Sequence, residues 1–302
     1  MIVRNRPGAL RLMLAWKGSV VPQILPHIIL AGLFATAVTW VSRHQYLDGI
    51  VDYTLLPFTL IGIALSILLS VRNTATYDRW WEARKQWGQM VYEIRSLART
   101  ASIYLDDASR RDLMMKALAH THLLRGQLRG EDVRSELPET LSQALVDEAM
   151  NKRNPAAFML QQAGLVVATA HKSGAVDSVA AAALDKHLHG LAGIQAASER
   201  ISQTPLPFAY TLLAHRTAYV YCYLLPFGLV GVAGWFTPVF TTIVAYTFFG
   251  LDRLSEHLEF PFGRRANDLP LDAICRVHEI SVAEALGEPA PEPLKPVAFQ
   301  LQ

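Results

Sequence analysis

Residues 57–73 read PFTLIGIALSILLSVRN, and this stretch decides the fold class. It belongs to a run without Asp, Glu, Lys or Arg that extends from Tyr53 to Val71, about 19 residues. A helix needs about 20 consecutive apolar residues to cross the hydrocarbon core of a bilayer. The run therefore predicts one membrane-spanning helix, which ends where Arg72 and Asn73 begin a polar segment.

Two stripes at helical spacing run along this predicted helix. Small side chains recur at every fourth residue on one stripe, and branched apolar side chains do so on the neighbouring stripe. The small stripe is Gly62, Ser66 and Ser70, and the branched stripe is Ile63, Ile67 and Val71. Small residues let helix backbones approach closely in lipid, so the first stripe predicts helix packing. The pattern fits a bundle made by one chain, and it also fits a symmetric ring of chains whose branched stripe lines a pore.

The other apolar runs extend this interpretation to the whole chain. Hydrophobic residues make up 51% of the 302 residues and charged residues only 18%, against about 25% charged in a typical soluble protein. The runs predict four membrane spans, at residues 22–41, 53–72, 207–226 and 234–252. The break between the last two is expected near Pro226, Gly228, Gly231 and Gly234.

A charged region separates the second and third spans. Over residues 73–200 apolar residues recur at helical spacing, as in the sets Met90, Ile94, Leu97 and Leu184, Leu188, Leu191. Breaks near Gly130, Pro138, Asn154-Pro155 and Ser173-Gly174 divide the region into several helices. Four prolines in residues 287–302 predict a flexible tail after a channel-like domain at 1–286. The predicted class is an all-α membrane protein with a cytoplasmic helical region.

Lysine and arginine positions predict the orientation in the membrane. Arg4, Arg6, Arg11 and Lys17 make the N-terminal segment basic, and the flanks at 72–85 and 253–265 are basic too. The turn between the last two spans has neither Lys nor Arg. We therefore expect a multi-pass protein of the inner membrane with both termini and the charged region in the cytoplasm.

Several classes of function find no support in the sequence. The formal net charge of +2 does not favour nucleic acid as a partner. No motif of a hydrolase, zinc protease or nucleotide-binding loop occurs, so no enzyme, catalytic residue or cofactor is predicted. His120 and His122, like His187 and His189, are two residues apart and would point to different faces of a helix, so no metal site is predicted. Arg216, inside the third span, is expected to face the bundle interior and to pair with a carboxylate or with backbone carbonyls.

The segment after the second span carries a resemblance to a known family. Residues 72–88 read RNTATYDRWWEARKQWG, and residues 198–210 read SERISQTPLPFAY. With WKGS at 16–19, LPFG at 225–228, PFG at 261–263 and NDLPLD at 267–272, their order and spacing resemble the bestrophin family, specifically its bacterial branch. The resemblance extends over roughly residues 10–285.

This resemblance implies an assembly and a set of pore residues. Bestrophins are pentameric channels with a pore on the five-fold axis, so a homopentamer is expected. Alignment of the pore helix places the membrane neck of the pore on Ile63, Ile67 and Val71. A second, cytoplasmic constriction falls on Val179, with Ala180 to Ala183 as nearby alternatives.

Two departures from the animal members bear on regulation and ion preference. Animal members bind calcium through an acidic run after the PFG element, whereas this chain has Arg264, Arg265 and a single acid, Asp268, in residues 264–268. Calcium is therefore not expected there. The aromatic rings of the animal neck are replaced by Ile67 and Val71, and bacterial relatives are associated with cation conduction, so a preference for cations over anions is expected.

The sequence thus predicts a pentameric channel through the lipid bilayer that passes small monovalent ions passively through an apolar neck, cations being favoured. The alternative is a non-conducting membrane scaffold or sensor whose cytoplasmic helices bind a partner. A membrane enzyme that acts on lipid is a further rival, for which Glu256 to Glu259 would supply the nearest polar cluster.

Overall fold

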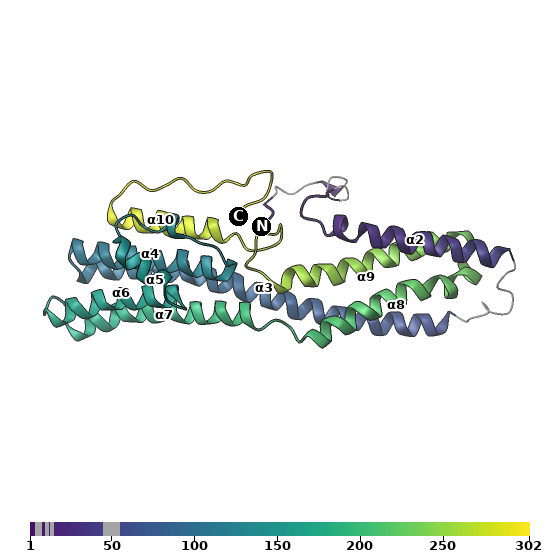
Figure 1. The fold of residues 1–302 in the computed structure, drawn as a ribbon, viewed down its shortest axis with the longest axis horizontal. Coiled ribbons are helices and arrows are strands. Elements are labelled where there is room, and N and C mark those ends of the chain that lie inside the picture. Colours follow the sequence, from purple (N-terminus) through teal and green to yellow (C-terminus); the bar gives the residue numbers. More distant parts are fainter. Residues whose placement is uncertain (4–7, 10–11, 13–14, 45–54) are drawn as a thin grey trace. The chain divides into compact units, whose positions relative to one another are not determined.

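The computed structural model describes residues 1–3, 8–9, 12, 15–44 and 55–302. In this part of the chain the regular elements are helices, as the sequence predicted, and no β-strand occurs (Figure 1). They are α2 (Val21–Arg43), α3 (Leu56–Tyr104), α4 (Asp107–Arg129), η1 (Arg134–Glu136), α5 (Gln143–Met150), α6 (Pro155–Lys172), α7 (Ser178–Gln203), α8 (Phe208–Ala233), η2 (Gly234–Phe236), α9 (Thr237–Glu259) and α10 (Leu271–Leu286). The basic residues Arg4, Arg6 and Arg11 and the start of the second predicted span, residues 53–54, lie outside the described residues.

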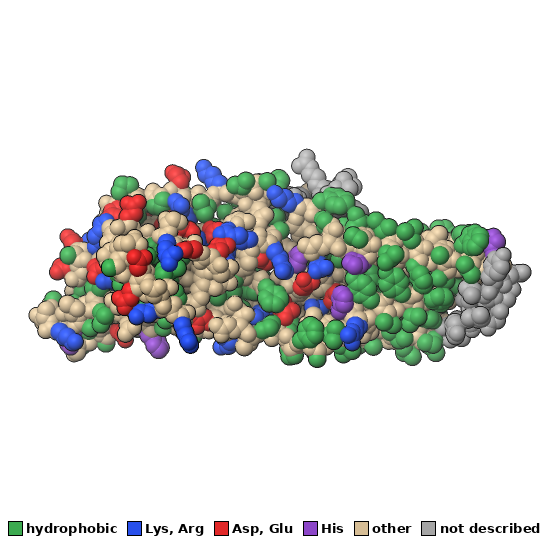
Figure 2. Space-filling model, viewed as in Figure 1, with side chains coloured by type: hydrophobic (Ala, Val, Ile, Leu, Met, Phe, Trp, Pro, Cys, Tyr) green, Lys and Arg blue, Asp and Glu red, His purple; other side chains and the backbone are tan. Residues whose placement is uncertain are grey.

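The helices belong to two compact units. The apolar unit consists of Asn5–Trp80 and Pro205–Phe260, and the polar unit consists of Met1–Arg4, Trp81–Thr204 and Pro261–Gln302. Figure 2 shows hydrophobic side chains gathered over α2, α8 and α9, and charged side chains over the helices of the polar unit. Helix α3 contributes residues 56–80 to the apolar unit and 81–104 to the polar unit.

The apolar unit is built from helices that can cross a membrane. Three continuous helical stretches are long and apolar enough to do so: Val21–Arg43, Leu56–Tyr104 and Phe208–Glu259. The third stretch contains α8, the short 3-10 helix η2 and α9, and α9 packs against both α8 and α2 (Figure 1). The four predicted spans therefore fall on α2, the beginning of α3, α8 and α9.

The structure places the break between α8 and α9 at Gly234 alone. Pro226, Gly228 and Gly231 lie inside α8, which continues to Ala233. A proline inside a helix removes one backbone hydrogen bond without ending the helix when the surrounding packing holds it. Gly234 has a φ of 54°, a conformation that glycine adopts at little cost, and the helix ends there.

Small buried side chains bring the four helices of the apolar unit close together. Its core consists of Ile24, Ile28, Ala31, Leu65, Leu69, Ala214, Ala218, Tyr221, Cys222, Leu225, Ala245, Phe248 and Phe249. Four of these are alanines that are fully buried. Because lipid provides no hydrophobic force between helices, such small residues stabilise the bundle through close van der Waals contact.

The polar unit is a bundle in which α4 packs against α6 and α10, and α6 against α7. Its helices begin and end near the predicted breaks: Asn154 caps α6, Asp177 caps α7 and Gly130 ends α4 in the left-handed conformation. The two predicted apolar sets, Met90, Ile94, Leu97 and Leu184, Leu188, Leu191, are buried, which confirms the helical spacing read from the sequence.

The C-terminal tail, residues 287–302, contains no helix and is joined by hydrogen bonds to other parts of the polar unit. The Leu301 N–H donates to the Met1 carbonyl at 2.8 Å, and the Ala273 N–H donates to the Gln302 carbonyl at 2.7 Å. The two ends of the chain therefore pair with each other. The flexibility expected for this segment stays a prediction.

Candidate functional site: an apolar helix face and its flanking charges

The branched stripe of α3 faces away from the core of its own chain. Ile63, Ile67 and Val71 are 54%, 61% and 51% exposed, whereas Leu65 and Leu69 on the opposite face are buried in the core. The four-residue spacing therefore produces the two-faced helix that the sequence predicted. A row of exposed branched side chains on one helix is a surface that lipid, water or another copy of the chain must cover.

The small stripe of α3 divides between two environments. A Cβ atom on Gly62 would lie 2.6 Å from the Tyr221 hydroxyl oxygen, so Gly62 allows the close approach of α8 within the chain. Ser66 and Ser70 are exposed, and the Ser66 hydroxyl donates to the Gly62 carbonyl at 2.8 Å. The structure therefore accounts for Gly62 inside one chain, whereas the two serines lie on its exposed surface.

A buried ionic cluster flanks the branched stripe. Arg72 follows Val71 directly and is only 1% exposed, and its guanidinium forms an ion pair with Asp252 of α9. Asp252 also accepts from His215 of α8, with 2.7 Å between Oδ2 and Nδ1. Glu259 Oε2 lies 4.0 Å from Arg72 Nη2. The buried guanidinium of α3 thus meets two carboxylates of α9, and these opposite charges compensate each other's desolvation.

Glu259 also fixes the chain at the start of α8. Its side chain accepts from the Leu206 N–H at 3.0 Å, and its backbone carbonyl accepts from Arg79 Nε at 2.7 Å. The sequence analysis named Glu256 to Glu259 only as the polar cluster nearest to that needed by a lipid-acting enzyme, and it did not predict this role. A usable signal was present, because charges that flank apolar helices need partners when they are buried.

The expectation for Arg216 is wrong. Arg216 is exposed on α8, and no ion pair joins it to another described residue. The buried arginine of the apolar unit is Arg72, which has the carboxylates of Asp252 and Glu259 close by. Burial of an arginine requires such partners, and the helix packing supplies them to Arg72 instead.

Val179 lies in the first turn of α7 in the polar unit and is 73% exposed. Asp177 fixes this turn, because its carboxylate accepts from the Ala180 N–H at 2.7 Å. Ala180 is buried, so Val179 is the outward-facing branched residue of the turn. Its role as a cytoplasmic constriction stays a prediction.

Arg264 lies in residues 264–268, the stretch where the resemblance led us to expect no calcium site. Its guanidinium donates to both carboxylate oxygens of Glu131, at 2.5 and 2.7 Å, and to Asp272 at 2.8 Å. The hydrogen bonds to Glu131 raise the pKa of Arg264. Burial would raise the pKa of Asp272, but Arg129, Arg125 and Arg264 together hold it below its ordinary value. These carboxylates are therefore neutralised by arginines of the chain itself.

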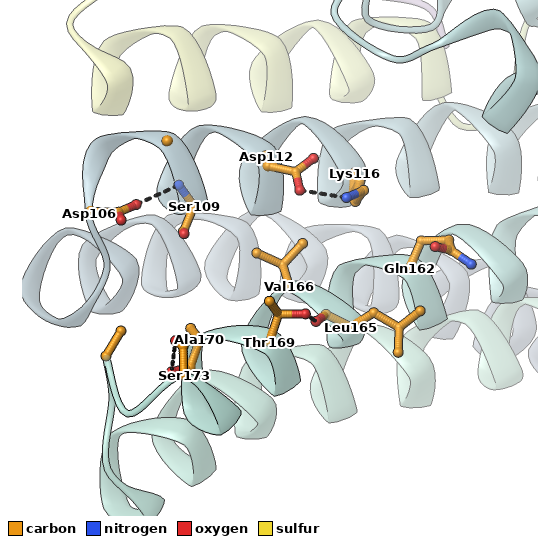
Figure 3. A pocket seen from close by; sticks show the side chains of 12 residues that line it. Asp106, Ser109, Asp112, Lys116, Gln162, Leu165, Val166, Thr169, Ala170 and Ser173 are labelled. Atoms are coloured by element: carbon orange, nitrogen blue, oxygen red, sulfur yellow. Dashed lines mark hydrogen bonds and ion pairs between the residues drawn. The ribbon is translucent and has the colours of Figure 1, made fainter.

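Figure 3 shows a pocket in the polar unit that is lined mainly by residues of α4 and α6. Asp112 and Lys116 form an ion pair across one turn of α4, at 2.6 Å. Thr169 and Ser173 donate to backbone carbonyls of their own helix. These polar groups are already satisfied by neighbouring residues, so the pocket offers little to a ligand.

Comparison with known proteins identifies the relatives of this arrangement. The family profile described as "Bacterial/Fungal Bestrophin protein" matches residues 1–284. A protein of Mesorhizobium japonicum named voltage-dependent anion channel-forming protein is 50% identical over 301 residues, which is 99% of this chain and 96% of the relative. The Escherichia coli K12 protein of that name is 38% identical over 289 residues, 95% of each chain. A crystal structure of a bestrophin homologue from Klebsiella pneumoniae superposes with a TM-score of 0.84 at 34% identity, covering 88% of this chain and 99% of that one.

These relatives overturn the predicted preference for cations, and with it the prediction of monovalent ions, with cations favoured, as the partners. The relatives that match almost the whole chain are named anion channel-forming proteins. The inference rested on the missing aromatic rings and on the association of bacterial relatives with cation conduction, and the first of these grounds has little physical force. Isoleucine and valine side chains carry neither a charge nor an oriented quadrupole, so an aliphatic constriction does not determine the sign of the permeating ion.

Proposed function

This chain belongs to the bacterial and fungal bestrophin family, and we propose that it forms a homopentameric channel that conducts anions passively across the inner membrane. The observation that carries the proposal is identity over almost the whole chain to proteins named as anion channels. Because the matched region includes both the apolar and the polar unit, the proposal concerns the assembled protein and not one part of it.

The exposed face of α3 supports a pore at the centre of the assembly. Ile63, Ile67 and Val71 are more than half exposed in the single chain, and five copies around an axis would stack them as three apolar rings. Such rings form the proposed neck, and they gate conduction by excluding water when the passage narrows. Ser66 and Ser70 would then lie where neighbouring α3 helices approach each other.

The basic residues that flank the predicted spans support the proposed orientation in the membrane. The four helices α2, α3, α8 and α9 are the proposed membrane spans, and both termini and the polar unit lie in the cytoplasm.

In the polar unit, Val179 is proposed to line the second constriction, because it is the outward-facing branched residue at the start of α7. The carboxylates near Arg264 are held by arginine, which supports conduction that does not require calcium at this position.

The decisive experiment is the reversal potential of the purified protein in a planar bilayer under a KCl gradient. We expect step currents that reverse near the chloride equilibrium potential. Reversal near the potassium potential would refute anion conduction while leaving a channel. Silence at all voltages, with the pentamer intact by native mass spectrometry, would favour the non-conducting scaffold instead.

A further inference from the structure

One arginine of the apolar unit lies on an exposed apolar face of α8. Leu213, Val220 and Leu224 are exposed, and their positions along the chain put them on one side of the helix. Arg216 lies on the same side, three residues after Leu213 and four before Val220, and it is exposed as well. Its side chain makes no hydrogen bond or ion pair with any described residue. This face of α8 therefore carries one positive charge that the chain itself does not compensate.

Arg216 lies at the level where the apolar part of α8 begins. The preceding residue, His215, is hydrogen-bonded to Asp252 of α9, and Asp252 also pairs with Arg72 at the end of the branched stripe of α3. From residue 217 to the end of α8 at Ala233 the helix contains no Asp, Glu, Lys or Arg. In the proposed orientation this level lies at the cytoplasmic surface of the bilayer, and the rest of α8 extends into the hydrocarbon. An arginine at such a depth needs an anionic partner.

The packing of α8 directs Arg216 away from α3. Tyr221 is the residue of α8 that approaches α3, at Gly62. Arg216 precedes Tyr221 by five residues, which separates the two side chains by about 140° around the helix. Further along the face of Arg216, the ring of Phe227 meets the ring of Phe34 from α2, with 6.0 Å between the centroids. The face of Arg216 therefore leads from an exposed cation to an apolar surface to which α2 contributes.

From these features we propose that Arg216 binds the phosphate of an anionic phospholipid in the cytoplasmic leaflet, an inference that rests on the proposed membrane spans. The guanidinium would donate two parallel hydrogen bonds to phosphate oxygens, which its planar fork allows. An acyl chain would lie on Val220, Leu224 and Phe227, a surface that extends roughly 16 Å along the helix from Arg216. A lipid with a net negative charge compensates the arginine, whereas a zwitterionic lipid has no net charge and brings an ammonium group of its own.

The test is native mass spectrometry of the purified full-length protein in a non-ionic detergent, titrated with phosphatidylglycerol or with phosphatidylcholine of the same acyl chains. We expect one phosphatidylglycerol per chain, bound about tenfold more tightly than phosphatidylcholine. In Arg216→Gln this preference should disappear, and in Arg216→Lys, which keeps the charge without the fork, it should be reduced. Arg153→Gln is the matched control, because Arg153 is an exposed arginine of the polar unit without an ion pair among the described residues, and its lipid preference should equal that of the wild type.

Two results would overturn the proposal. One is the absence of bound phosphatidylglycerol in the wild type, or equal affinities of the wild type for the two lipids. The other is the same lipid preference in Arg216→Gln as in Arg153→Gln; if the Arg216→Gln oligomer also dissociates, the arginine belongs to a contact between copies of the chain instead. The titration does not depend on conduction, so its failure and the failure of the proposed channel function are distinguishable.

Discussion

Arg72 and the residues around it show how one side chain joins three helices. Arg72 is buried directly after the exposed Val71, and Asp252, His215 and Glu259 surround it from α9 and α8. Two charges in a protein interior stabilise each other only when both are present, because each is costly to bury alone. The apolar face of α3 is therefore held in orientation by a polar contact at its end.

Removal of one partner tests this interpretation. Arg72→Met leaves the Asp252 carboxylate in the interior without its arginine, and we expect a loss of about 3–5 kcal/mol in unfolding free energy. This loss in unfolding free energy is measured by thermal and denaturant unfolding in detergent. The control is Arg253→Met, whose ion pair with Glu256 is partly exposed to solvent and contributes less than about 1 kcal/mol. Equal effects of the two substitutions would contradict the role of Arg72.

A second residue-scale feature is a group of buried histidines between α4 and α10. Burial, together with the nearby His122, His120 and Arg95, lowers the pKa of His278 to about 3. Burial lowers the pKa of His120 as well. The pKa of a histidine in the unfolded chain is about 6.5. As the pH falls below that value, the unfolded chain takes up a proton before the folded one does, so stability decreases between about pH 6.5 and pH 3.

The pH dependence of unfolding tests this feature. Between pH 7.5 and 5.5, His278 alone should lower the free energy of unfolding by about 1.4 kcal/mol. In His278→Leu that part of the loss should disappear, whereas a variant of the exposed His189, His189→Gln, should keep it. An unchanged pH dependence in His278→Leu would show that His278 titrates normally in the folded protein.

At the scale of elements, Gly228 is a second glycine, besides Gly62, at which α3 and α8 approach closely. A Cβ atom on Gly228 would lie 2.3 Å from Cδ2 of Phe58, well inside van der Waals contact. An aromatic ring packed between helices cannot move away without disturbing its other neighbours. Gly231, one turn further along α8, has no atom within 4 Å of the corresponding position and is exposed.

The two glycines form a matched pair of substitutions with opposite expected signs. Gly228→Ala should destabilise the protein by about 1–3 kcal/mol, as overpacking does elsewhere. Gly231→Ala should leave stability unchanged or raise it by up to about 1 kcal/mol, since alanine favours a helix. The stabilities of the two variants are compared by their unfolding midpoints in detergent. A Gly228→Ala variant as stable as Gly231→Ala would show that Phe58 moves freely.

At the scale of the whole molecule, the exposed branched face of α3 should become a water-accessible wall in the assembled channel. Cys222 and Cys275 are both buried free thiols, so a new cysteine at an accessible position can be modified selectively. We expect that adding a charged methanethiosulfonate reagent during a bilayer recording changes the current carried by the Ile67→Cys variant. Leu33→Cys is the control, because Leu33 is an equally exposed apolar residue, but of α2.

The pattern of modification distinguishes pore from lipid surface. Reagent effects at residues 63, 67 and 71, and none at residue 33, would support the neck. An effect at Leu33→Cys with none at Ile67→Cys would place the water pathway elsewhere. Because the measured quantity is current, the experiment examines the protein in its assembled and conducting state.

The sequence by itself determined which segments are apolar, which positions share a helix face and where most helices end. Charge-free runs, four-residue spacing and breaks such as Asn154-Pro155 act within one segment, so they can be read before any packing is known. Ile63, Ile67 and Val71 were placed on one face for this reason, and that face is exposed in the structure.

Only the tertiary structure decided which charges meet. Arg72 and Asp252 are 180 residues apart, and Arg264 reaches Glu131 from 133 residues away. Sequence analysis gave the buried position to Arg216 because both arginines border or interrupt apolar runs and look alike locally. The packing of α3 against α8 and α9 brings carboxylates to one of them and leaves the other exposed. Such pairings depend on how helices from distant parts of the chain are arranged in space, and no local pattern contains that information.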